Sequence, residues 1–117
     1  DAKDLQQIYE KFELEKQFLA DYTSTNQTVR VYIQKMLTRL YATDDPTQID
    51  ATHNSKINSL GFPIYHMETA DGYRLYYAYS KTSAKPIHIL CHCIKSKEAV
   101  YFNKMKNSET FKKKFRN

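Results

Sequence analysis

Hydrophobic positions in the first third of the chain recur with the period of an α-helix. Over residues 4–21 they fall near one face of such a helix: Leu5, Ile8, Phe12 and Leu19. The segment 22–26 is rich in residues that cap helices, so it should end this helix and start another. The second helix should end near Thr43, and it has an apolar stripe of its own: Val29, Tyr32, Ile33, Met36, Leu37 and Leu40. We expect the pair to form an antiparallel helical hairpin.

The pattern changes from helical to alternating in the second half of the chain. Residues 44–60 are polar and have no clear period, which predicts a long connecting loop. Residues 62–67 predict a short strand, and the pair Asp71-Gly72 is a strong signal for a hairpin turn. The strand after that turn should bury the alternate residues Tyr73, Leu75, Tyr77 and Tyr79.

A third strand begins at Pro86 and is apolar on both faces, as is typical of an inner strand. Strict alternation places one set of side chains on one face: Ile87, Ile89, Cys91 and Cys93. It places the other set on the opposite face: His88, Leu90, His92 and Ile94. Residues 97–106 predict at least one helical turn, and residues 111–115 a short amphipathic helix among lysines. This order of elements predicts an α+β fold, with helices packed on one face of a small antiparallel sheet.

A length of 117 residues fits a single domain, residues 1–117. The net charge of +5 is concentrated at one end. Residues 1–94 hold ten Lys/Arg against eleven Asp/Glu, whereas residues 95–117 hold eight against two. This asymmetry favours an anionic partner at the C-terminal end, or else a solvated basic tail.

No apolar run approaches the roughly 20 residues that a membrane span requires, so we expect no membrane partner. The two cysteines are separated by one residue and cannot link distant parts of the fold. We therefore expect a reducing, cytoplasmic setting.

Four short motifs follow one another between residues 56 and 101. A Leu-x-Gly segment ends Lys56–Gly61, a turn with glycine leads into an aromatic-Arg-aliphatic strand at Asp71–Tyr77, an aliphatic strand follows at Ile87–Leu90, and a basic segment ends in Val-Tyr at Lys95–Tyr101. In this order and spacing they resemble the RelE-like superfamily of bacterial toxins. The resemblance implies the toxin of a toxin–antitoxin module, with a cognate antitoxin protein, messenger RNA and the ribosome as partners.

The chain departs from the family pattern in two places. Family members usually begin with a strand before the first helix, and this sequence predicts none. The best-known ribosome-dependent members carry lysines on the strand before the arginine, where this chain has Ile64–Glu68. Other members use Glu or His there, so His66 and Glu68 are plausible substitutes.

The resemblance also implies an endoribonuclease that cuts messenger RNA without a metal or other cofactor. Such cleavage needs a base for the ribose 2′-OH, a cation for the phosphorus and an acid for the leaving oxygen. Arg74 is the predicted cation, because its planar fork can hold two phosphate oxygens. Glu68 or His66 is the predicted base, and His92 on the third strand is a further catalytic candidate.

The C-terminal end supplies the remaining predicted site residues. Lys95 and Lys97 would bind phosphates, and Tyr101 would stack on a base or hydrogen-bond near the scissile bond. The run Lys112, Lys113 and Lys114 would add non-specific, salt-dependent RNA binding.

Each of these residues also has an ordinary structural interpretation. Arg74 can pair with Glu68 across two strands, His66 can belong to a polar strand face, and His92 can be a satisfied core residue. The lysines can form a solvated basic surface. His88, Cys91, His92 and Cys93 are suitable zinc donors but lack the spacing of the common sites, so we predict buried thiols and no metal.

Two other functions stay open. The first is a non-catalytic toxin of the same fold, similar to the ParE branch, which inhibits DNA gyrase by binding. The second is a non-enzymatic RNA- or protein-binding domain.

Overall fold

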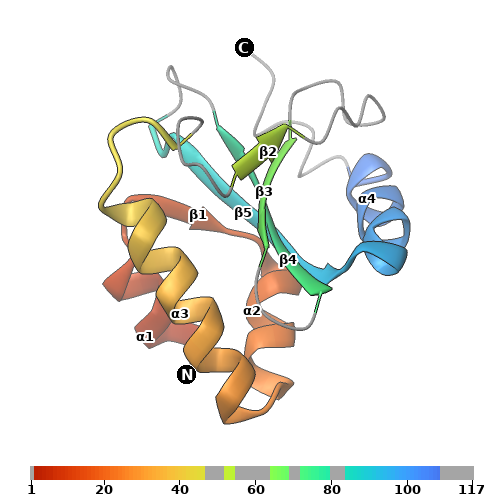
Figure 1. Ribbon diagram of the computed structural model, residues 1–117, viewed down its shortest axis with the longest axis horizontal. Helices are drawn as coiled ribbons and strands as arrows, with labels where there is room; N and C mark the ends of the chain where they lie inside the picture. The colour runs from red at the N-terminus through yellow and green to blue at the C-terminus, as the bar shows by residue number, and fades with distance from the viewer. Residues whose placement is uncertain (1, 47–51, 55–63, 69–71, 80–83, 109–117) are drawn as a thin grey trace.

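The computed structural model describes residues 2–46, 52–54, 64–68, 72–79 and 84–108. Within them the elements follow the order α1 (Ala2–Ile8), β1 (Phe12–Leu14), α2 (Lys16–Ser24), α3 (Gln27–Tyr41), β2 (Thr52–Asn54), β3 (Ile64–Glu68), β4 (Tyr73–Tyr79), β5 (Ile87–Ile94), a 3₁₀ turn (Lys95–Lys97) and α4 (Glu98–Lys106). The predicted α+β class is confirmed (Figure 1).

The strands form one five-stranded sheet in the order β1-β5-β4-β3-β2. Neighbours are antiparallel except β1, which runs parallel to β5, so the sheet is mixed and not purely antiparallel as predicted. β1 pairs only with the first half of β5, where Phe12 lies opposite Ile87 and Leu14 opposite Ile89. The edge of β5 beyond Ile89 therefore has no strand beside it among the paired residues.

Each face of the sheet has its own buried cluster. Side chains of α1, α2 and α3 pack with Met67, Leu75, Tyr77 and Ile89 on one face, which we call the helical face. On the opposite face, the α4 face, Phe102 and Met105 of α4 pack with sheet residues that include Ile64, Tyr76, Leu90 and Cys91. Figure 1 shows α4 across the sheet from the other three helices. The prediction that helices cover only one face is therefore wrong.

The predicted helix over residues 4–21 is also wrong, because β1 divides it into α1 and α2. Phe12 and Leu14 lie two positions apart and are both buried, which is the spacing of a strand. The Glu15 N–H donates to the Ile89 carbonyl at 3.0 Å, so the sheet edge satisfies backbone groups that a continuous helix would have bonded internally. The N-terminal part is therefore no simple helical hairpin. A strand that the sequence did not predict comes before the α2–α3 pair.

A β-bulge reverses the predicted alternation of side chains along β5. Tyr76 pairs with Cys91 and the next residue, Tyr77, pairs with Ile89, so Leu90 is the extra residue. Beyond the bulge, Cys91 and Cys93 lie opposite Tyr76 and Arg74 on the α4 face, and His92 lies opposite Leu75 on the helical face. His88 lies opposite Ala78 on the α4 face. The prediction that the two histidines share a face is therefore wrong.

Other local predictions have mixed outcomes. The second helix is present as α3, and the Asn26 side chain caps it by accepting from Val29 N–H at 2.9 Å. β2 lies within the segment 44–60 that was predicted to be a loop. Gly72 has a φ of 76°, as suits the predicted turn. The Lys56–Gly61 motif and Lys112, Lys113 and Lys114 lie outside the described residues.

None of the helices in the described ranges has the length and apolar character needed to cross a membrane.

Leu37 provides a test of the helical-face core, because its side chain on α3 is fully buried. We expect Leu37→Ala to lower the free energy of unfolding by about 2–5 kcal/mol, since it removes buried methyl groups and leaves a cavity. Urea unfolding would measure this change. Val31→Ala on the exposed side of the same helix is the matched control, with an expected change within about 0.5 kcal/mol. Equal effects of the two substitutions would contradict this placement of α3.

Candidate functional site

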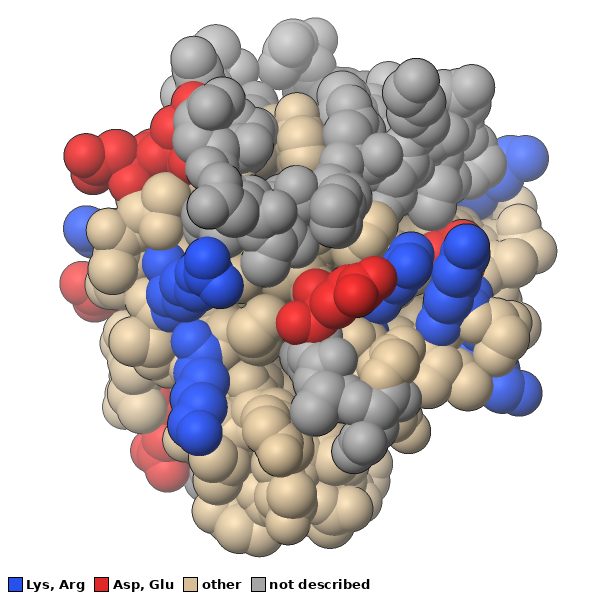
Figure 2. Space-filling model, viewed as in Figure 1, with Lys and Arg blue, Asp and Glu red and all other residues tan. Residues whose placement is uncertain are grey.

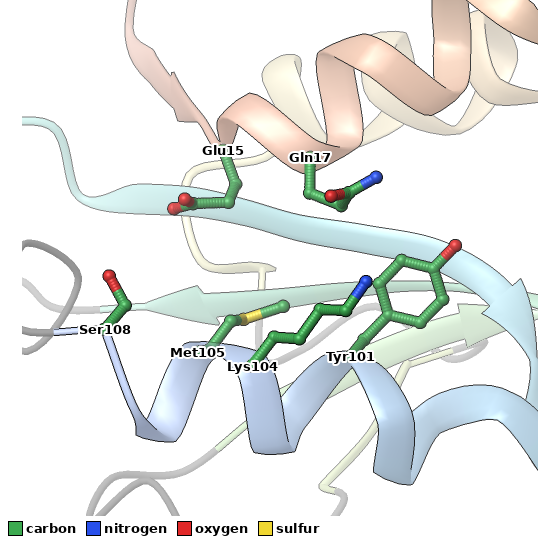
Figure 3. Close-up of a pocket in the computed structure, with 6 residues that line it drawn as sticks. All are labelled: Glu15, Gln17, Tyr101, Lys104, Met105 and Ser108. Carbon is green, nitrogen blue, oxygen red and sulfur yellow. The ribbon is translucent and has the colours of Figure 1, made fainter.

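A cavity of about 380 Å³ lies between α2 and α4, along the half of β5 whose outer edge is not covered by β1. We call it the β5 groove. Its lining includes Gln17, Tyr73, His92, Lys97, Tyr101 and Lys104. Two smaller pockets adjoin it, one sharing Tyr73 and His92 and the other sharing Gln17, Tyr101 and Lys104. Figure 3 shows the second of these, with side chains from α4 facing those at the start of α2 across β5.

Tyr101 links α4 to α2 across the groove. Its hydroxyl donates a hydrogen bond of 2.8 Å to Asp21 Oδ2, and the two residues are 80 positions apart in the chain. Burial and the Asp21 carboxylate both raise the pKa of Tyr101 above its ordinary value. The phenol therefore stays protonated at neutral pH. Because its proton points at Asp21, the lone pairs of the Tyr101 oxygen are left to accept a hydrogen bond.

Asp21 is a candidate site residue that no sequence pattern predicted. It is one of thirteen acidic residues and belongs to no motif, so nothing distinguished it from an ordinary helix-surface residue. Only the packing of α2 against α4 brings its carboxylate to Tyr101.

His92 and Tyr73 form an aromatic wall of the groove. Their rings are stacked, with centroids 5.0 Å apart and planes 11° from parallel. Burial lowers the pKa of His92 to about 4, so its imidazole is neutral at physiological pH. Tyr73 is 37% exposed, which leaves ring surface available to a ligand. A flat, uncharged ring could stack here.

Lysine side chains supply the positive charge of the groove. Lys97 and Lys104 line it and are exposed, and Lys95 is exposed in the same 3₁₀ turn as Lys97. Figure 2 shows basic side chains on the side of the molecule where α4 lies, and others on the side where α1 and α3 lie. Exposed ammonium groups around a concave surface attract anions such as phosphate.

Arg74 lies on the other face of the sheet from His92. Its guanidinium pairs with the Glu68 carboxylate at 3.1 Å, as the ordinary structural interpretation proposed. His66 is buried on the same face, with its ring centroid 5.7 Å from that of Tyr76. Arg74, Glu68 and His66 are thus brought together on the α4 face, against which Tyr101 of α4 also packs, but none of the three lines the β5 groove. Of the predicted catalytic residues, His92 and Tyr101 line the groove, whereas Arg74, Glu68 and His66 do not.

A hydrogen bond between two side chains fixes the start of α4 to strand β4. The Tyr76 hydroxyl donates to Glu98 Oε2. Burial and the Glu98 carboxylate raise the pKa of Tyr76 above its ordinary value. His88 is buried on the α4 face, with Nε2 2.9 Å from Glu15 Oε2. These contacts hold the elements on either side of the groove.

The groove therefore combines aromatic surface, two ammonium groups and a phenol held by a carboxylate. Aromatic surface and positive charge together suit a polyanion with flat bases, as in single-stranded RNA. Among the described residues, no three His, Cys, Asp or Glu side chains are grouped so as to hold a metal ion.

Comparison with protein-family models, with curated proteins and with solved structures finds no match to this chain.

The environment of His92 predicts a dependence of stability on pH. The unfolded state takes up the imidazole proton near pH 6.5, whereas the folded state does so only near 4. Stability is therefore complete above about pH 6.5 and falls as the pH is lowered towards 4, by on the order of 2 kcal/mol between pH 6.5 and 5.

Urea unfolding of wild type and His92→Phe at pH 7.5 and pH 5 would measure this effect. We expect the variant to lose markedly less stability on acidification, because it lacks the titrating group and retains an aromatic ring beside Tyr73. The same loss in both proteins would show that His92 is not the group responsible.

Proposed function

We propose that the chain is a RelE-like toxin that binds single-stranded RNA in the β5 groove and cleaves it without a metal. The observation that carries this proposal is the hydrogen bond between Tyr101 and Asp21, set within a groove lined by Lys97 and Lys104. A phenol that is hydrogen-bonded to a carboxylate is a suitable proton relay. We expect the phosphate to bind beside this phenol, at the two lysines.

The order of elements supports the proposal. β1 comes before the α2–α3 pair, and the antiparallel strands β3, β4 and β5 lead into α4. Apart from α1, which precedes β1, this order resembles the family layout that the sequence motifs imply. The motif residues Lys97 and Tyr101 both line the groove.

The residues of the groove can supply each step of the reaction. An exposed base stacks on Tyr73, and the ammonium groups of Lys97 and Lys104 bind the phosphate. The 2′-OH donates to the Tyr101 oxygen while the Tyr101 proton moves to Asp21, so the carboxylate acts as base through the phenol. The 2′-oxygen then bonds to phosphorus and the 5′-oxygen leaves, taking a proton from a lysine ammonium. The products are a 2′,3′-cyclic phosphate and a 5′-hydroxyl.

The paired cation Arg74 has no step in this scheme. Its catalytic role stays a prediction, because the Glu68 carboxylate already neutralises its charge and neither residue lines the β5 groove. Comparing Arg74→Ala with Tyr101→Phe therefore shows whether the chemistry takes place at the Arg74–Glu68 pair or in the β5 groove.

Cleavage assays test the proton relay. We expect wild type to cut single-stranded RNA in the presence of a chelator, alone or with translating ribosomes, and to leave 2′-O-methyl RNA intact. Tyr101→Phe and Asp21→Asn should each lower the cleavage rate by about 10²–10⁴-fold, the range of a lost acid–base step. Tyr32→Phe, at an exposed tyrosine of α3, is the matched control and should cut at the wild-type rate.

Expression in bacterial cells separates the competing functions. Growth arrest with transcripts cut inside translated codons, lost in Tyr101→Phe, supports the ribonuclease. Arrest with intact transcripts would favour the gyrase-inhibiting alternative, and no arrest would favour a binding domain.

The salt dependence of RNA binding tests the role of the lysines. We expect Lys97→Ala and Lys104→Ala each to weaken binding and to reduce the slope of log K against log salt by about 0.7, because each removes one phosphate contact to a single strand. Lys35→Ala on α3, where the ammonium lies 5.9 Å from the Tyr32 ring, should leave the slope unchanged. Equal slopes for all four proteins would place the RNA elsewhere.

A further inference from the structure

The sheet holds a pair of thiols that the proposed reaction does not use. Cys91 and Cys93 are both free and buried, and both lie on the α4 face of β5. Residues two apart on a strand point to the same side, so the two sulfurs are neighbours. The neighbouring Cys93 thiol and burial both raise the pKa of Cys91 above its ordinary value.

The pair is accessible from the β5 groove. Cys93 lines that cavity and is 4% exposed, whereas Cys91 lies behind it with no exposed surface. A small ion that enters the groove therefore meets the Cys93 sulfur first and has the Cys91 sulfur directly beside it.

The donors present select the kind of ion. In the described part of the chain, the two thiols have no third His, Cys, Asp or Glu placed to complete a metal-binding group. Structural zinc sites need four donors, so zinc does not fit. Cu(I) is a soft ion that prefers sulfur and is satisfied by two thiolates. A further soft sulfur belongs to the same buried cluster, in Met105, whose side chain points from α4 towards β5 (Figure 3).

We propose that Cys91 and Cys93 form a two-thiolate site that binds one Cu(I) ion. The ion replaces the two thiol protons, both S–Cu bonds form without any transfer of electrons, and the protons leave through the groove. The site is independent of the proposed RNA cleavage, because neither thiol takes part in that reaction.

Titration of the purified full-length chain with Cu(I), without oxygen and against the chromophoric chelator bicinchoninate, tests this proposal. We expect wild type to take one equivalent from the chelator and to retain no Zn(II). Cys91→Ala and Cys93→Ala should each lose this binding. Met67→Leu is the control, because it alters a buried sulfur on the helical face, and it should bind as wild type does.

Three results would overturn the proposal. They are no Cu(I) uptake by wild type, uptake as high as that of wild type by both alanine variants when circular dichroism shows them folded, and binding of Zn(II) by wild type as tight as its binding of Cu(I). X-ray absorption by copper-loaded wild type gives a second test that needs no variant. We expect sulfur neighbours at the copper, and a shell of nitrogen or oxygen alone would also overturn the proposal.

Discussion

β1 has three residues and β5 has eight, and the parallel pairing between them ends at Ile89. This difference in length determines where the helices lie. The chain leaves the sheet at Glu15 and enters α2 beside the unpaired half of β5, and α4 returns along the opposite face. A longer β1 would have occupied the edge that the groove now exposes. The groove, the Tyr101–Asp21 hydrogen bond and the lining lysines all depend on this early end of pairing.

The bulge at Leu90 decides which side chains can act together. Without the extra residue, His92 and His88 would share a face and the cysteines would lie on the other. With it, His92 joins Tyr73 on the helical face, and the cysteines meet Arg74 and Tyr76 across the sheet. Bulges commonly redirect side chains next to functional sites, and here one extra residue decides on which face of the sheet the aromatic wall and the thiol pair each lie.

Elements with a strong period were predictable from the sequence. The stripe of α3, the strands β3, β4 and β5, and the α+β class all follow from local hydrophobic spacing. β1 was not predictable, because Phe12 also fits the stripe of a helix and only the edge of β5 makes the extended form preferable. Lys97, Tyr101 and His92 were identified as site residues by resemblance or residue type. Asp21 was not, because its role arises from a contact between residues 80 positions apart.

The same long-range contact has a consequence for how the chain folds. β1 cannot pair until β5 has been synthesised, and Asp21 cannot accept its hydrogen bond until Tyr101 has been. The groove therefore joins a segment made early in synthesis to one made late. Pairings of such high sequence separation carry a large loop-closure entropy and slow the folding of a domain. A nascent chain that has not yet extended past residue 101 lacks Tyr101 and most of α4, and therefore has no groove. Any activity of the groove must begin only after nearly all of the described chain has left the ribosome.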